Sequence, residues 1–168
     1  MTLDESLAHW QRERARLEAL DAWIDAGKTK PPQPLTPVVG VYLSLDKPGA
    51  KDALKAAREE AGKDAFIRMF AAFEHGFRPV FCDWLAKKCG LPVPSPDIAK
   101  ALPDAIRGVL DIAAALEPRL DASRRGYAGN VMSYRNDLVH RGFAAPLPYD
   151  LVVLHCKLSE IIAIFAVT

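Results

Sequence analysis

A polar stretch near the C-terminus, YRNDLVHRG at 134–142, brings together residue types that can do chemistry. Arg135, Asn136 and His140 lie within about one and a half helical turns. A histidine can accept or donate a proton near neutral pH, and an arginine presents a planar fork of donors that matches phosphate oxygens. These residue types can transfer a proton and bind an anion.

Periodicity places this stretch at the end of a helix predicted over Ala122–Arg141. Its expected core face consists of Tyr127, Val131, Tyr134 and Leu138. At about 100° per residue, Asn136 and His140 fall on the opposite side and Arg135 falls on the flank. We therefore expect His140 outside the core. It is either part of a functional site or a solvated histidine in the last turn, where the helix dipole favours its cation.

A second feature of this helix is the mixed character of its outward face. Arg125, Gly129, Met132 and Asn136 are predicted to share it, so small, apolar and polar groups alternate there. Small residues allow another helix to approach closely. We therefore expect a homodimer in which two such faces oppose each other.

The elements that must hold this helix are also predicted to be helical. An amphipathic helix covers Leu3–Ala26, and a proline-rich loop covers 28–49. Within the loop, VVGVYLSL at 38–45 favours an extended segment, which either packs over the bundle or pairs between subunits. Two helices follow over 51–61 and 64–89, separated at Gly62.

The helix over 64–89 carries the predicted core. Five aromatic rings recur on one face, at Phe66, Phe70, Phe73, Phe77 and Phe81. Pro79 predicts a kink near His75. A short helix with Ser95 as its cap and helices over 103–117 and 148–166 complete a single all-α domain of 168 residues, an irregular bundle of four to five main helices.

Composition excludes several classes of protein. Lysine and arginine total 22 against 21 acids, so any contact with nucleic acid must be local. Three cysteines give no disulfide framework, and the charged N-terminus does not resemble a signal peptide, so we expect a cytoplasmic protein without a membrane span. His75, Cys82 and Cys89 recur every seven residues, about 10 Å apart along a helix, which is too far for one metal ion.

The motif itself resembles that of a known family. RNDLVH, with Arg135, Asn136 and His140, is similar to the R-x4-6-H motif of HEPN domains, all-α proteins that include many metal-independent ribonucleases. The size of the chain and the closing helix after the motif are also similar to those of HEPN domains, and the resemblance covers about residues 51–168. FAAFEHGFR at 70–78 is similar to an early helix of several bacterial groups in the family, with Glu74 and Arg78 as possible supporting residues.

The resemblance implies cleavage of RNA by its own 2′-hydroxyl, which leaves a 2′,3′-cyclic phosphate. It implies Arg135 and His140 as catalytic residues, Asn136 as the residue that orients them, and no cofactor. It also implies a homodimer, and it suggests a toxin or phage-defence setting with an antitoxin or regulatory protein as partner. Arg107, Arg119, Arg124, Arg125 and Arg141 are the arginines that could contact RNA phosphates, although a solvated charged face explains each of them equally well.

Two other interpretations stay open at the level of sequence. One is a scaffold with the HEPN fold that binds nucleotides or proteins without turnover. The other is a structural helical adaptor unrelated to the family. The arginine and histidine favour catalysis, whereas the near-neutral charge argues against a general nuclease that is always active.

Overall fold

The computed structural model describes residues 1–28, 39–141 and 146–166, without the side chain of Arg141. The helices are α1 (Leu3–Asp25), α2 (Val39–Leu43), α3 (Lys47–Lys88), α4 (Pro96–Ala101), α5 (Ile106–Leu116), α6 (Ala122–Arg141) and α7 (Leu151–Ala166). The described part of the chain contains no strand, so the predicted all-α class is confirmed. None of its helices combines the length and the apolar character needed to cross a membrane.

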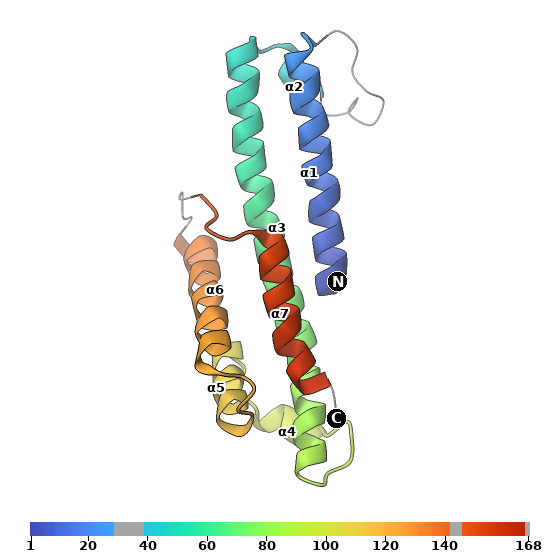
Figure 1. Ribbon diagram of the computed structural model, residues 1–168, viewed down its shortest axis with the longest axis vertical. Helices are drawn as coiled ribbons and strands as arrows, with labels where there is room; N and C mark the ends of the chain where they lie inside the picture. Colours follow the sequence, from blue (N-terminus) through green and yellow to red (C-terminus); the bar gives the residue numbers. More distant parts are fainter. Residues whose placement is uncertain (29–38, 142–145, 167–168) are drawn as a thin grey trace.

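The central element is α3, a helix of 42 residues that runs along almost the whole molecule (Figure 1). All five phenylalanines of its predicted stripe are completely buried, which confirms them as core residues. The ring of Phe77 stacks on Phe73 and Phe81 at centroid distances of 5.4 and 5.8 Å. Phe165 from α7 meets Phe77 edge-on at 5.5 Å. This aromatic column is the surface onto which the C-terminal helices pack.

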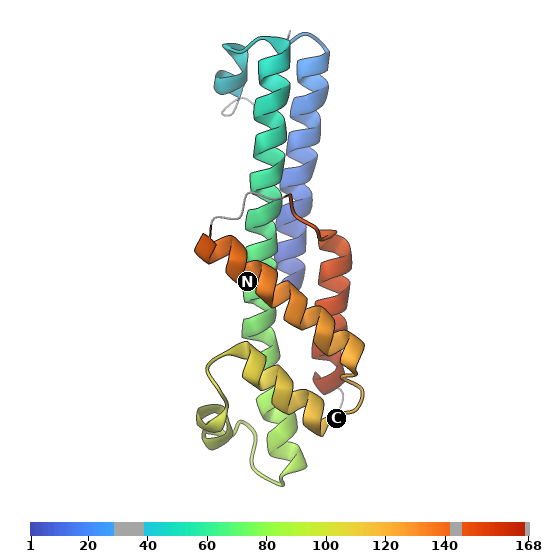
Figure 2. The same ribbon diagram turned by 90° about the vertical axis from the view of Figure 1, so that its left-hand side faces the viewer.

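The remaining helices divide between the two halves of α3. Helices α4 to α7 surround its C-terminal half, and α6 crosses it obliquely (Figure 2). Helix α1 lies beside the N-terminal half, and the two extend beyond the bundle as an arm. The arm has a hydrophobic core of its own, formed by Leu20, Trp23, Ile24, Val39, Tyr42, Ala50 and Leu54.

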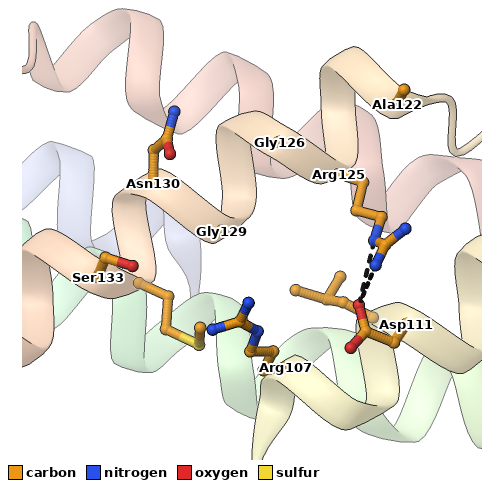
Figure 3. A pocket seen from close by; sticks show the side chains of 10 residues that line it. Arg107, Asp111, Ala122, Arg125, Gly126, Gly129, Asn130 and Ser133 are labelled. Carbon is orange, nitrogen blue, oxygen red and sulfur yellow. Dashed lines mark hydrogen bonds and ion pairs between the residues drawn. The ribbon is translucent and has the colours of Figure 1, made fainter.

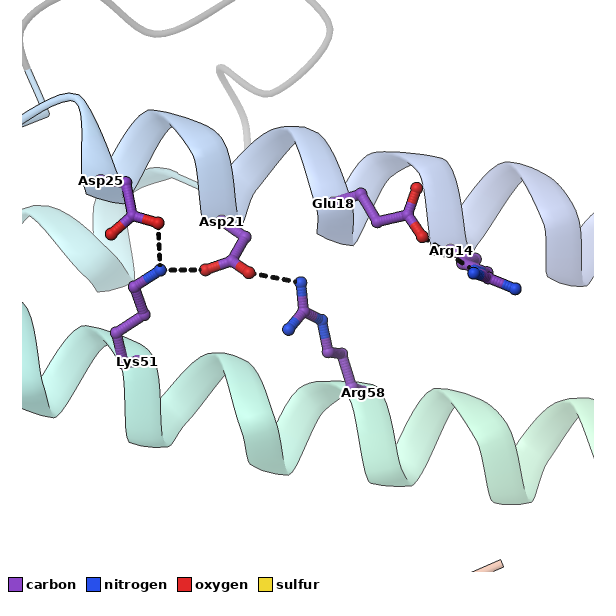
Figure 4. Close-up of polar contacts among 6 residues, drawn as sticks. All are labelled: Arg14, Glu18, Asp21, Asp25, Lys51 and Arg58. Carbon is purple, nitrogen blue, oxygen red and sulfur yellow. Dashed lines mark hydrogen bonds and ion pairs between the residues drawn. The ribbon is translucent and has the colours of Figure 1, made fainter.

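Ion pairs also join α1 to α3 along the arm (Figure 4). The carboxylate of Asp21 accepts hydrogen bonds from Lys51 and, at 2.8 Å, from Arg58. Lys51 also contacts Asp25 at 2.7 Å. The hydrogen bonds from Lys51 and Arg58 lower the pKa of Asp21 below its ordinary value. The charged form of this carboxyl group is therefore favoured in the folded state.

The predicted extended segment at 38–45 is wrong for the residues that the structure describes. Val39–Leu43 forms the short helix α2. Val39 and Tyr42, three positions apart, are both buried against the arm core, and this spacing suits a helical turn. Tertiary packing has overridden the β-propensity of the valines here. Residues 29–38, which include most of the prolines of the predicted loop, lie outside the described residues.

The predicted break at Gly62 is also wrong, because α3 continues through Gly62, Gly76 and Pro79. A glycine inside a helix costs only about 1 kcal/mol, and packing against α1 on one side and α7 on the other outweighs it. Gly62 is itself buried, and a Cβ atom there would lie 3.7 Å from Leu147. Farther along the chain, α4 begins after Ser95 as predicted, although the Ser95 side chain makes no capping bond.

We expect Phe77→Ala to lower the free energy of unfolding by about 3–5 kcal/mol, because it removes a ring that stacks on both sides and leaves a cavity. Urea denaturation followed by circular dichroism measures this. Val153→Ala, an exposed position on α7, is the control and should change stability by no more than about 0.5 kcal/mol. An equal effect of the two substitutions would contradict the aromatic column as the centre of the fold.

We expect the contribution of Asp21 to stability to depend on pH. Its pKa is lowered in the folded protein, so the stabilisation is fully present above about pH 4 and is lost as the pH falls through the lowered pKa. Asp21→Asn should therefore destabilise the protein at pH 7, by up to about 1 kcal/mol for such a partly exposed pair. Urea denaturation at pH 7 and pH 3 should show the difference from wild type shrinking at pH 3. Asp52→Asn, an exposed aspartate on α3, serves as the control.

Candidate functional site

The helix that carries the motif, α6, is held at both ends. At its start the carboxylate of Asp121 accepts the backbone N–H of Arg124 at 2.8 Å, as an N-cap does. Near its end the ring of Tyr134 packs edge-on against Phe66 of α3 at 5.1 Å, and it meets Tyr149 at 5.5 Å. Burial raises the pKa of Tyr134, so its phenol stays neutral at physiological pH. These contacts fix the rotation of α6 about its own axis.

The predicted core face of α6 is confirmed. Val131 is fully buried, and Tyr127, Tyr134 and Leu138 are partly buried against the main hydrophobic core. Asn136 and His140 are exposed on the other side, while Arg135 is half-buried on the flank. His140 is therefore not a core histidine, and both it and Arg135 are accessible in the single subunit.

The arginine of the motif turns toward the exposed side of the helix. Its Nη1 atom donates a hydrogen bond to Oδ1 of Asn136 at 3.0 Å. Asn136 lies four positions before His140, so the two side chains share one side of α6. The hydrogen bond thus draws the Arg135 guanidinium toward the side that presents the imidazole. Backbone geometry alone separates Arg135 and His140 by about 140°.

One residue of the predicted outward face belongs elsewhere. Met132 is only 9% exposed and joins the main core, so its assignment to the outward face is wrong. The reason is that α5 packs along this flank of α6 and covers it. Gly129 and Arg125 also face α5 but are not covered by it: Arg125 is exposed, and a Cβ atom at Gly129 would have no neighbour within 4 Å.

A cleft of about 390 Å³ lies between α5 and α6 (Figure 3). Its charged lining consists of Arg107 and Asp111 from α5 and Arg125 from α6. Asn130 and Ser133 supply neutral polar groups. Gly126 and Gly129 also line its α6 side and contribute no side chain there. His140 lies beyond the end of this cleft and does not line it.

Asp111, Asn130 and Ser133 were not among the residues singled out from the sequence. Ser133 could have been found, because the helical projection that places His140 outward also places Ser133 on that face, whereas it places Asn130 on the flank of the core face. No sequence pattern predicts a role for Asp111, because its partner Arg125 lies on another helix, and the spacing of residues along the chain does not show which side chains of two helices come together.

The arginines expected to contact RNA differ in their surroundings. Arg125 pairs with Asp111 at 2.9 Å, and Arg124 pairs with Asp121 at 2.7 Å. Arg119 pairs with Glu117 and also donates to the carbonyl of Ile164. No hydrogen bond or ion pair joins Arg107 to another residue that the structure describes. The side chain of Arg141 lies outside the described residues.

The possible supporting residues Glu74 and Arg78 line a different cleft, of about 230 Å³, together with His75 and Asp104. Arg78 donates to the backbone carbonyls of Pro103 and Asp104 at 2.7 and 2.6 Å. These bonds tie α3 to the turn before α5. They indicate that Arg78 helps to position α5, one wall of the α5–α6 cleft.

The cysteines lie in unlike surroundings. Cys82 is buried, where desolvation raises its thiol pKa, whereas Cys89 and Cys156 are exposed. Within the described residues no three histidine, cysteine or acidic side chains gather closely enough to hold a metal ion. Cys82 is therefore a packing residue of the core, and Cys89 and Cys156 are surface residues.

Comparison of the chain with protein-family models, curated proteins and solved structures finds no match in any of the three. The resemblance to HEPN domains therefore stays a prediction from the sequence motif.

Proposed function

We propose that this protein is a metal-independent endoribonuclease of HEPN type, in which Arg135 and His140 are catalytic. The observation that carries the proposal is the hydrogen bond from Arg135 to Asn136, with Asn136 and His140 exposed on the same side of α6. This bond supports the orienting role that the resemblance implies for Asn136. It also brings the guanidinium of Arg135 toward the surface that presents the imidazole of His140.

The reaction follows from these groups. The 2′-oxygen of a ribose attacks the adjacent phosphorus, and the bond from phosphorus to the 5′-oxygen breaks. Imidazole accepts the proton of the 2′-hydroxyl, and imidazolium returns a proton to the leaving 5′-oxygen. The guanidinium of Arg135 stabilises the charge that gathers on the phosphate oxygens. The products are a 2′,3′-cyclic phosphate and a 5′-hydroxyl.

Two proton-transfer steps on opposite sides of phosphorus suit two histidines, and a dimer supplies them. We propose a two-fold homodimer in which the Asn136 and His140 surfaces of two subunits face each other. The C-terminal part of α6 supports this, because Asn136 and His140 are exposed there and do not line the α5–α6 cleft. The exposed Val139, 45% accessible beside His140, would gain burial in such an interface.

A scaffold without turnover is the second candidate. The pairing of Arg124 and Arg125 with aspartates favours it, because these side chains offer less free positive charge to RNA than their number suggests. An antitoxin or regulatory partner, in a toxin or phage-defence setting, stays a prediction of the resemblance for either candidate.

We expect His140→Ala or Arg135→Ala to lower the rate of RNA cleavage by about 10²- to 10⁴-fold, because each removes a group that acts in the transition state. Asn136→Ala should lower it less. Cleavage of a labelled single-stranded RNA on denaturing gels, in the presence of EDTA, measures the rate. Mass spectrometry should identify cyclic phosphate ends.

His9→Ala, a histidine on α1, is the matched control and should cleave as wild type does. His140→Ala should also melt within a few degrees of wild type, since an exposed side chain contributes little to stability. Undiminished cleavage by His140→Ala would overturn the motif assignment. A folded wild-type dimer that leaves varied RNAs intact would favour the scaffold.

We expect the protein to be a dimer at micromolar concentration, with or without reducing agent. Multi-angle light scattering measures its mass against the 18.4 kDa of one chain. Val139→Arg should shift it toward monomer, because a charged side chain would replace an exposed apolar one that the interface would bury. Lys100→Glu, on α4 away from this surface, is the control. A wild-type monomer would contradict the proposed interface.

A further inference from the structure

The cleft between α5 and α6 has features of a polyanion site that the catalytic motif does not account for. It is open to solvent, and its volume of about 390 Å³ falls within the usual range for ligand clefts. Its walls carry two guanidinium groups and one carboxylate, so the charged lining has one positive charge in excess. Its neutral polar groups are an amide and a hydroxyl, from Asn130 and Ser133. Figure 3 shows Arg107, Asp111 and Arg125 directed toward the space between the helices, whereas the Asn130 amide points away from it.

Arg107 is the charged group of this cleft that is available to a ligand. It is exposed on α5, and no hydrogen bond or ion pair joins it to another described residue. Arg125, on the opposite wall, is held by Asp111 through Nε at 3.1 Å and through Nη2 at 2.9 Å. Arg107 is therefore ready to bind an anion, whereas Arg125 has to exchange Asp111 for one.

The α6 wall of the cleft allows close approach of a chain. Gly126 and Gly129 contribute no side chain to it, and a Cβ atom at either position would meet nothing within 4 Å. The buried floor beneath is apolar, with Leu110 and Met132. A ribose–phosphate backbone can therefore reach the helix surface while its phosphates meet the arginines on either side.

The cleft also ends one helical turn before the proposed catalytic motif on α6. Ser133, at its near end, lies three positions before Asn136 and seven before His140. These separations correspond to axial rises of about 4.5 and 10 Å. All three residues lie within about 60° of one another around the helix. A strand lying in the cleft would thus continue toward the imidazole.

We propose that the α5–α6 cleft binds the backbone of the single-stranded RNA that leads to the scissile phosphate. Arg107 is its primary phosphate contact, and Arg125 becomes a second one on release from Asp111. Asp111 limits the affinity, because it competes for Arg125 and repels the phosphates. The inference rests on the proposed ribonuclease function, and it adds Arg107 and Arg125 as positioning residues that set RNA affinity.

The test measures binding separately from cleavage. Fluorescence anisotropy follows a labelled single-stranded RNA with His140→Ala protein, so that the RNA stays intact. Adding Arg107→Ala should weaken binding by about 10-fold, as expected for a charge-assisted hydrogen bond. It should also reduce the slope of log affinity against log salt by about 0.7 for the lost phosphate contact. The matched control is Arg12→Ala, which removes an exposed arginine from α1, a helix that does not line the cleft.

A second substitution changes the affinity in the opposite direction. Asp111→Asn removes the negative charge and frees Arg125, so it should tighten RNA binding by about 3- to 10-fold. In the cleaving protein with His140 intact, Arg107→Ala should raise KM with little change in kcat, because it removes binding that is uniform along the reaction. A purely structural role for Arg107 or Asp111 would instead alter the melting temperature and leave RNA affinity unchanged.

Three outcomes would overturn the proposal: equal losses of affinity for Arg107→Ala and Arg12→Ala, no tightening by Asp111→Asn, or dissociation of a dimer by Arg107→Ala with RNA affinity unchanged. The last would assign the cleft to a second copy of the chain. Failure here is distinguishable from failure of the ribonuclease proposal. Cleavage that depends on His140 but not on Arg107 would contradict only the proposed RNA-binding cleft. RNA binding that depends on Arg107, without any cleavage, would contradict only the proposed ribonuclease activity.

Discussion

The packing of one aromatic face of α3 is the constraint on which the rest of the structure depends. Five fully buried phenylalanines form a column on this helix. Its C-terminal end contacts α7 through Phe165, and its N-terminal end contacts α6 through Phe66 and Tyr134. Because large rings bury much area and prefer a few mutual geometries, this column sets both the position and the rotation of the helices that lie on it. That packing therefore determines the direction in which the side chains of α6 point.

The same packing leaves α6 with two unlike sides. One side carries tyrosines and aliphatic residues against the core, whereas the other carries glycines, short polar residues and the exposed motif residues Asn136 and His140. Glycines lower the intrinsic stability of a helix by about 1 kcal/mol each relative to alanine. The exposed glycines of α6 are thus not explained by helix formation. Close approach of an RNA backbone, as proposed for the α5–α6 cleft, would account for them.

Much of this arrangement was predictable from the sequence wherever periodicity was regular. The bounds of α6, its core face and the phenylalanine column follow from spacing alone, because a helix that packs on one side must repeat its apolar residues at that period. Where local and tertiary preferences disagreed, prediction failed. Gly62 predicts a helix end, but neighbouring helices hold α3 together there. The valines near Val39 favour a strand, but their burial against the arm core requires a helix. Met132 was misplaced because a single projection cannot show that α5 covers a second flank of α6.

Charge compensation determines which of the arginines can act on a polyanion. The chain is almost neutral, and most of the basic groups around α6 have an acid beside them, as in the pairs of Arg119 with Glu117, Arg124 with Asp121 and Arg125 with Asp111. Exposed pairs of this kind contribute little to stability, but they reduce the field that an approaching phosphate experiences. Arg107 stands outside this pattern, and Arg135 bonds to a neutral amide. A nearly neutral protein can therefore still present positive charge at two places along α6, one in the cleft and one at the motif. Binding to RNA would then depend on a strand that meets both places at once, which favours extended single strands over compact or duplex RNA.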